Sequence, residues 1–381
     1  MSQLNVDAIR SANGTGDAIS LAAASNTCTA NITNNLSNRN LIINGAMQCA
    51  QYGSSSTTNG YGSVDRWKCL HANTDEAPTS AQHALTSSDT GPWAAGFRNS
   101  FHITNGNQTS GLGAPDYILF RQVIEAQNIT NSGWEYTSTS SYLTLSFWVK
   151  SSVAQNFYGT IRSEDGTRQN YPFETGSLTA DTWTKITKTI PGNANLTFDN
   201  NTGPGMEVEV NAAFGSDYTD AGVALNTWAA YASATINPVN TATWYTTNDS
   251  TFEITGVQLE VGDYATDFEH RSYGDELARC QRYFYAFRPA GSFWRDGYSD
   301  GNIYVPGYVW FPVQMRANPT DTMVGTMTHG NNESGGDALA EAPYTKQDYA
   351  YSYVRSNSSG RTYSYWNTYV DGVGFTFSAE L

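Results

Sequence analysis

Apolar and polar residues alternate over residues 251–262, where Phe252, Ile254, Val257, Leu259 and Val261 take the apolar positions. This period of two is typical of a strand with one buried face. Similar patterns predict strands at residues 117–124, 142–149, 156–161, 183–190 and 206–211. Turn-forming residues separate several of them, at 164–166, 191–192 and 200–204. Many short strands at this spacing predict an all-β jelly-roll sandwich over residues 40–271.

One helix is predicted after this sandwich. Ser272 and Asp275 have the spacing of a capping box, and Leu277, Cys280 and Phe284 follow at helical intervals. We therefore expect a connecting helix over residues 272–287. Strand-like sequence then returns at 302–313, 322–324 and 374–378, which predicts a small C-terminal β domain over residues 288–381.

The first 39 residues are polar and contain only short apolar alternations. Such a segment cannot bury enough apolar surface to fold alone. Two interpretations are open: a disordered leader, or a docking arm that becomes ordered by pairing with identical chains or with a larger assembly.

Charge and cysteine content exclude several classes of function. The chain has 381 residues and a net charge of −15, and no basic cluster is visible, so nucleic acid is not an expected partner. No long apolar run predicts membrane insertion, and the N-terminus lacks the pattern of a signal peptide, which leads us to expect synthesis in a host cytoplasm. The four cysteines, at 28, 49, 69 and 280, form no closely spaced pair and are expected to be buried reduced thiols.

The segment 40–48 together with 251–262 resembles a family of bacteriophage virion proteins. The resemblance continues through 266–283, includes Met315-Arg-Ala-Asn-Pro319, and ends at Ser378-Ala-Glu-Leu381. It implies a tail-fibre or fibre-like adhesin with a jelly roll of the carbohydrate-binding-module type. It further implies a homotrimer on a virion tail or capsid surface, residues 1–39 as a docking and trimerisation segment on other virion proteins, and host surface polysaccharide as a partner.

Catalysis is not supported by any motif. Glycoside hydrolysis needs two carboxylates at a fixed separation, and no candidate carboxylate lies in a recognisable motif. Glu260 matches the family pattern, and we interpret it as a hydrogen-bonded or ion-paired residue at a strand end. His270, between Glu269 and Arg271, is interpreted as part of a solvated charge cluster. The protein is therefore not expected to be an enzyme.

Aromatic residues supply the candidates for glycan binding, because a planar ring stacks on the apolar face of a pyranose. Trp228, Trp244 and Tyr245 lie in less periodic, loop-like sequence, whereas Trp148 and Trp183 lie in strand patterns and are expected in the core. The C-terminal region offers a second group. Its members are Phe293, Trp294, Tyr298, Tyr363, Tyr365 and Trp366, of which Trp294, Tyr298 and Trp366 are the main candidates. Both groups are equally compatible with burial between protomers.

Calcium is the one metal considered, because jelly-roll carbohydrate-binding modules often carry a structural Ca²⁺ held by loop oxygens. Asp199, Asp217 and Asp220 lie in loops of suitable composition, although none follows EF-hand spacing and such loops more often serve as turns. No other cofactor is expected.

We therefore expect a phage virion structural protein, a tail fibre or receptor-binding adhesin that recognises host glycans without catalysis. The alternative is a capsid or tail decoration or connector protein, in which the aromatic residues form interfaces. A polysaccharide depolymerase would require a carboxylate pair that converges in a groove.

Overall fold

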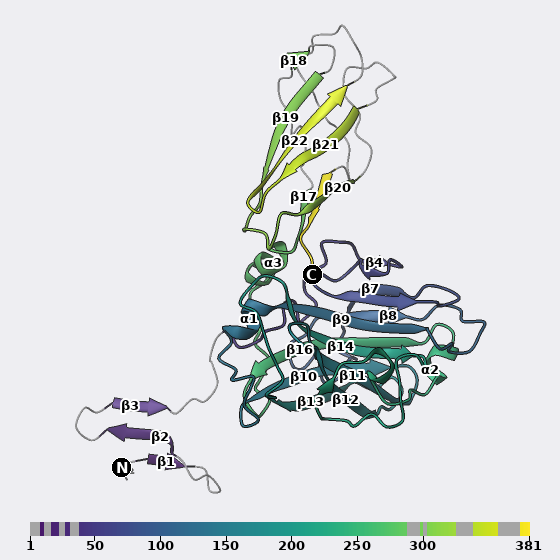
Figure 1. Cartoon of the computed structure of the whole chain (residues 1–381), viewed down its shortest axis with the longest axis vertical. Coiled ribbons are helices and arrows are strands. Elements are labelled where there is room, and N and C mark those ends of the chain that lie inside the picture. The colour runs from purple at the N-terminus through teal and green to yellow at the C-terminus, as the bar shows by residue number, and fades with distance from the viewer. Residues whose placement is uncertain are drawn as a thin grey trace.

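The computed structural model describes residues 8–10, 17–22, 27–30, 38–287, 298–299, 303–324, 338–356 and 374–381. Side chains are described for 38–287, 308–322, 345–350 and 375–381. Strands dominate this part of the chain and its helices are short (Figure 1). None of these helices has the length and apolar character needed to span a bilayer.

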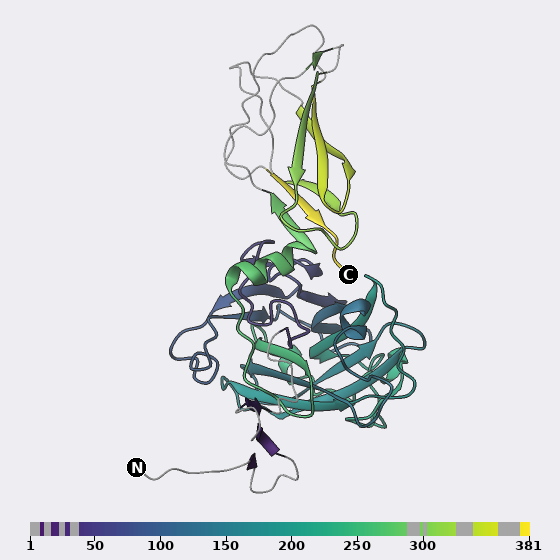
Figure 2. The same cartoon turned by 90° about the vertical axis from the view of Figure 1, so that its left-hand side faces the viewer.

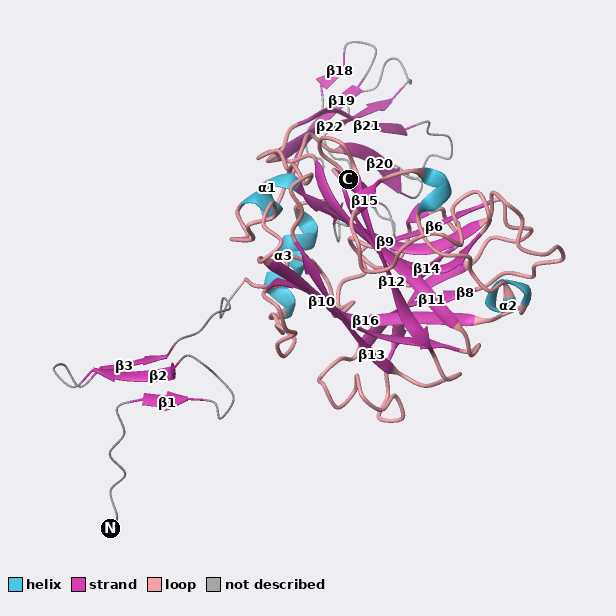
Figure 3. Cartoon of the chain, turned by 60° about the horizontal axis from the view of Figure 1, so that its bottom comes forward, coloured by secondary structure: helices cyan, strands magenta, loops and turns pink. Residues whose placement is uncertain are grey.

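Two antiparallel sheets face one another and form a sandwich, which confirms the predicted all-β class (Figures 1 and 3). The six-stranded sheet has the order β13-β10-β16-β8-β7-β4, and the seven-stranded sheet has the order β15-β12-β11-β14-β9-β6-β5. The first contains β4 (Ser55–Ser56), β7 (Thr79–Ala84), β8 (Asn99–Thr104), β10 (Tyr142–Ser151), β13 (Thr184–Pro191) and β16 (Thr251–Val261). The second contains β5 (Gly60–Tyr61), β6 (Lys68–Ala72), β9 (Tyr117–Glu125), β11 (Asn156–Ser163), β12 (Gln169–Ser177), β14 (Pro204–Phe214) and β15 (Ala229–Ala230). Short helices lie in the connections: α1 (Ala126–Thr130), the 3₁₀ turn η1 (Ser233–Thr235) and α2 (Thr243–Thr246).

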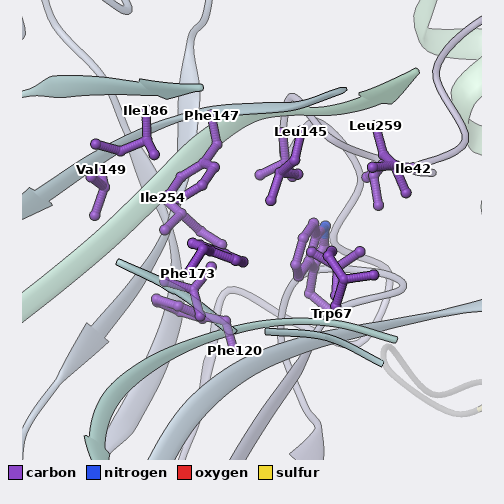
Figure 4. Close-up of a cluster of buried hydrophobic side chains, with 14 of the residues drawn as sticks. Ile42, Trp67, Phe120, Leu145, Phe147, Val149, Phe173, Ile186, Ile254 and Leu259 are labelled. Atoms are coloured by element: carbon purple, nitrogen blue, oxygen red, sulfur yellow. The ribbon is translucent and has the colours of Figure 1, made fainter. Parts of the chain in front are cut away.

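The six strands predicted from alternation are all present, and their apolar faces form the core between the sheets (Figure 4). Along β16 the apolar positions that face the core change phase, from Phe252 and Ile254 to Val257 and Leu259. The register with β10 shifts at this point, opposite Phe147, and Gly256 has a φ of +62°. An extra residue with positive φ is a β-bulge, so the bulge keeps both halves of the strand facing the core.

Segment 40–48 and strand β16 lie in contact, although they are far apart in the sequence. The Asn40 side chain donates to the Val257 carbonyl oxygen at 3.1 Å and accepts from the Leu259 amide at 3.0 Å. A Cβ atom on Gly45 would lie 2.1 Å from the Val257 oxygen, so only glycine fits there. The two segments that carry the family resemblance therefore form one structural unit.

The helix begins where predicted and ends earlier. Ser272 caps α3 (Tyr273–Gln281), because its Oγ accepts from the Asp275 amide at 3.2 Å. The prediction of helix to residue 287 is wrong, since Phe284 starts strand β17 (Phe284–Phe287). Pairing with a strand from the end of the chain overrides the helical spacing of Phe284.

The described residues of the C-terminal domain form two small antiparallel sheets, with the orders β17-β23-β20 and β18-β19-β22-β21. Their strands are β18 (Tyr298–Ser299), β19 (Ile303–Trp310), β20 (Thr320–Val324), β21 (Ala338–Thr345), β22 (Tyr349–Ser356) and β23 (Gly374–Ser378). Because β23 pairs with β17, the end of the chain returns to the sandwich, and α3 lies between the two regions (Figure 2).

Buried polar contacts fasten the C-terminal domain to the sandwich. Glu380 forms an ion pair with Arg66, which is 1% exposed and lies 3.5 Å from the Tyr283 ring centroid. Arg316 donates to the carbonyl oxygens of Ala379 at 2.6 Å and Thr202 at 3.0 Å. The domain is therefore anchored to the sandwich through Arg316 and through the end of the chain.

The prediction of a solvated charge cluster at residues 269–271 holds for the exposed His270 and is wrong for Glu269 and Arg271. The Arg271 side chain is 7% exposed and binds Glu269 at 3.0 Å and the Asn40 carbonyl oxygen at 2.6 Å. His270 Nε2 lies 2.9 Å from the Ala95 oxygen. The charges are largely buried because they hold segment 38–42 against the sandwich.

The N-terminal segment contains a separate three-stranded antiparallel sheet of β1 (Ala8–Arg10), β2 (Asp17–Ala22) and β3 (Thr27–Ala30) (Figure 1). The role of this segment in docking and trimerisation stays a prediction.

Candidate functional site

The predicted glycan-binding aromatics of the sandwich belong to its core. Trp244 and Tyr245 are fully buried, and Trp228 is 9% exposed. Their polar atoms bond inside: Trp244 Nε1 to the Thr251 oxygen at 2.9 Å, Tyr245 Oη to Asp116 at 3.0 Å, and Trp228 Nε1 to the Pro191 oxygen at 2.7 Å. The prediction that they form a stacking surface is wrong, because the loop-like sequence that carries them packs into the hydrophobic core.

The candidate glycan-binding residues of the C-terminal region have side chains that the structure does not describe. Trp294 and Trp366 lie outside the described residues. Tyr298 lies in β18, and its side chain is outside the described set. Their proposed role stays a prediction.

An aromatic group that the sequence patterns did not single out lies on the C-terminal domain: Tyr308, Trp310 and Tyr349, hereafter the aromatic platform. Trp310 is 67% exposed and Tyr308 is 55% exposed. Their rings stack with centroids 6.4 Å apart and planes 18° apart, and Tyr349 lies 5.4 Å from Trp310. Side chains this large and this exposed on one sheet face are typical of a binding surface.

Strand register places the three rings together. Tyr308 and Trp310 are two residues apart on β19, so they point to the same face, and Tyr349 on β22 pairs directly with Trp310. The intervening Val309 is 1% exposed and Ala350 is fully buried, on the opposite face. The alternation of Tyr308 and Trp310 around Val309 was visible in the sequence, but it did not reveal which face is covered.

The platform suits sugar recognition chemically. Exposed indole and phenol rings present flat apolar surface for a pyranose, and phenol hydroxyls provide polar tips. The turn before Tyr349 carries the exposed residues Lys346 and Asp348, a donor and an acceptor close in sequence to the platform.

Two concave sites lack such rings. A cleft of about 700 Å³ lies between α3 and the C-terminal domain, and a pocket of about 270 Å³ lies over β12. Neither lining includes a Trp, Tyr or Phe. The cleft is lined by Asn38, Glu269, His270, Arg271, Ser272, Asp275, Ala278, Arg279, Arg282, Val313 and Gln314.

The calcium candidates serve as turn residues. Asp199 accepts from the Asn201 amide nitrogen Nδ2 at 3.3 Å, and Asp220 accepts from the Gly222 amide at 2.7 Å. Asp217 is exposed, and none of the three belongs to a group of converging metal-ligand side chains within the described residues. Two other groups in that part of the chain do converge: Cys49, Asp65 and Cys280 in the interior, and His83, His102 and Glu253 on the six-stranded sheet.

Two buried carboxylates, Glu260 and Glu125, make structural contacts. Glu260 is fully buried and accepts from the Thr266 amide at 2.8 Å and hydroxyl at 2.7 Å, in line with the predicted structural role. Glu125 binds Arg282 at 2.8 Å and is buried; hydrogen bonds from Arg282 and Tyr283 lower its pKa although burial opposes this. A carboxylate whose pKa is lowered by a paired arginine, as that of Glu125 is, does not provide the protonated acid that glycoside hydrolysis needs.

Comparison with known proteins gives weak likenesses. No protein-family model and no curated sequence matches the chain. Among solved structures, the bacteriophage CBA120 tailspike protein 4 enzymatically active domain is 13% identical with a TM-score of 0.31, over 58% of this chain and 21% of that one. The N-terminal cellulose-binding domain of Cellulomonas fimi β-1,4-glucanase C is 8% identical with a TM-score of 0.26, over 57% of this chain and 99% of that one.

A third example is the family 11 carbohydrate-binding module of Clostridium thermocellum Lic26A-Cel5E, with 12% identity and a TM-score of 0.25, over 57% of this chain and 98% of that one. This chain therefore spans about a fifth of the tailspike and nearly all of each module. With TM-scores this low, the assignment of the sandwich rests on its strand pairing.

Proposed function

We propose that the protein is a non-catalytic, glycan-binding adhesin of a phage virion, and that the aromatic platform contacts the sugar. The observation that carries the proposal is the exposure of Trp310 and Tyr308 as a stacked pair on one sheet face. The sandwich would then act as a rigid support, since its own aromatic candidates are buried.

Affinity in this proposal comes from avidity. A flat platform with few polar neighbours binds one sugar weakly, and three copies on a homotrimer raise the effective concentration of the others. The N-terminal sheet would attach the trimer to other virion proteins. The buried ion pair of Arg66 and Glu380 supports the proposal that the sandwich is a rigid support, because it fixes the domain that carries the platform relative to the sandwich.

Binding to host-cell polysaccharide tests the proposal. Labelled wild-type protein should bind susceptible cells in competition with whole phage, and Trp310→Ala should weaken binding about 30-fold or more, the loss of a hot-spot residue. Tyr264→Ala removes an aromatic residue of similar exposure (52%) from the sandwich and should leave binding unchanged. Equal binding by wild type and Trp310→Ala would contradict the role of the platform.

A decoration or connector role is the second candidate, because exposed aromatics also form protein interfaces. In that case Trp310→Ala should change the assembly state or incorporation into particles, and the wild-type protein should bind no host polysaccharide. Light scattering on both proteins separates the two roles, and a mass of one or two chains would contradict the homotrimer.

A further inference from the structure

Three potential metal ligands converge on the outer face of the six-stranded sheet, far in sequence from the aromatic platform. His83 lies on β7, His102 on β8 and Glu253 on β16, which are neighbouring strands. Glu253 pairs directly with His102, and His83 pairs with Ser100, two residues from His102. Paired and alternate residues share a face, so the register itself brings the three side chains together.

The separations between ligand atoms match those around a tetrahedral metal ion. His83 Nδ1 lies 3.1 Å from Glu253 Oε2, and His102 Nδ1 lies 3.3 Å from Glu253 Oε1. Bonds of about 2.0–2.1 Å at tetrahedral angles place neighbouring ligands about 3.3–3.4 Å apart. Each imidazole lies beside a different carboxylate oxygen, and all the ligand atoms lie within 4.8 Å of one another, so movement of the side chains by about an ångström would let them bind one ion.

The nitrogen atom of His102 that faces the carboxylate makes no hydrogen bond. His102 Nδ1 is buried, lies 3.3 Å from Glu253 Oε1 and has no hydrogen-bond partner. The other nitrogen, Nε2, lies 3.0 Å from Thr104 Oγ1. In the tautomer that carries its proton on Nε2, Nδ1 presents a lone pair toward the carboxylate, which is the form of imidazole that binds a metal ion.

Second contacts orient the carboxylate. Ser100 Oγ donates to Glu253 Oε2 at 2.7 Å, and Glu253 is 2% exposed. His83 keeps half of its side chain exposed, which provides a path for an ion from solvent. Lys150 Nζ lies 3.0 Å from Glu253 Oε1 and supplies a competing positive charge, so we expect moderate affinity.

We propose that His83, His102 and Glu253 form a binding site for a late first-row divalent metal ion such as Zn²⁺, with solvent in the open fourth position. Two imidazoles and one carboxylate form a ligand set that suits Zn²⁺. The ion would join β7, β8 and β16 on the outer face of the sandwich. This inference does not depend on the proposed glycan binding.

Calorimetric titration of tag-free, chelator-treated, full-length protein with ZnCl₂ tests the site. We expect one ion per chain and a rise in Tm on binding. His102→Ala and Glu253→Gln should each weaken binding by at least the 10–100-fold that loss of an outer contact typically costs. His71→Ala removes a histidine from the other sheet and should bind as wild type does.

Two further variants keep the test decisive if a buried substitution prevents folding. His83→Ala alters an exposed edge of the site and should also weaken binding. Lys150→Met removes the competing charge and should tighten it, which a purely structural cluster would not show. Wild-type protein that binds no Zn²⁺ at millimolar concentration, or His83→Ala protein that binds as tightly as wild type, would overturn the proposal.

Discussion

The core of the sandwich and the aromatic platform of the C-terminal domain use tryptophan and tyrosine in opposite ways. In the sandwich, Trp67, Trp244 and Tyr245 are fully buried, whereas Trp310 and Tyr308 of the C-terminal domain are mostly exposed. The sandwich covers the inner face of each sheet with the other sheet, while the β19 face that carries the platform is left open to solvent. Tryptophan and tyrosine therefore stabilise the core of the sandwich, and on the C-terminal domain they form the surface that we propose binds a glycan.

Replacing one tryptophan in each region with alanine should give the largest difference in the free energy of unfolding. Trp244→Ala should lower the free energy of unfolding by about 3–5 kcal/mol, because it leaves a cavity and removes a buried hydrogen bond. Trp310→Ala should change it by no more than about 0.5 kcal/mol, since its ring is exposed. Urea unfolding of both variants measures this difference, and similar losses would show that the platform is covered in solution.

The junction between the regions gives the next effect. Arg66→Ala leaves the Glu380 carboxylate buried without its ion-pair partner and should cost about 3–5 kcal/mol. Arg168→Ala breaks the ion pair of a half-exposed side chain with Glu164 and should cost about 1 kcal/mol or less. Limited proteolysis of residues 284–381 should accelerate only in Arg66→Ala. Equal proteolysis of both variants would argue against a rigid junction.

Buried charge in the sandwich predicts a pH dependence that the exposed platform does not share. Burial raises the pKa of Asp65 from 3.8 to about 7. A raised folded pKa means that this contribution to stability is fully present below about pH 4 and is lost as pH rises to about 7. At about 1.4 kcal/mol per pKa unit, the change amounts to a few kcal/mol.

The Asp65→Asn variant removes the contribution of Asp65 to the pH dependence of stability. Unfolding measured from pH 4 to pH 8 should show a smaller fall in stability for the variant than for wild type. Parallel curves for the two proteins would contradict the assigned pKa shift.

The helix between the regions gives the smallest effect. Ser272→Ala removes the N-cap hydrogen bond to Asp275 and should cost about 1 kcal/mol. Ser272→Asn preserves a capping side chain and should stay close to wild type in thermal unfolding. Equal losses in both variants would mean that the hydroxyl matters for another contact.

Much of the sandwich was predictable because its strands have one buried face. Alternation identified β10 and β16 closely, and Asp275 three residues after Ser272 identified the start of α3. Strands β6, β7, β8 and β12 were missed. Their apolar pattern is too short to recognise: β7 contains only Ala81 and Ala84 as apolar residues, and β8 contains only Phe101 and Ile103.

The candidate site was predicted less well. Sequence context predicts the wrong tryptophan to be exposed. Trp244 lies in loop-like sequence and is buried, whereas Trp310 lies in a strand pattern and is exposed. A strand pattern states that two faces differ, and does not state which of them another layer covers. That information depends on contacts between residues far apart in the chain.

The sequence by itself determined the all-β class, the main strands of the sandwich, the first turn of α3 and the acidic character of the chain, because these depend on local periodicity and composition. The tertiary structure decided the rest. It ended α3 at Gln281 by pairing Phe284 with the returning chain end, buried Trp244 and Tyr245, and left the aromatic platform exposed. It also brought His83, His102 and Glu253 together from three strands, since convergence of side chains follows from strand register and layer packing.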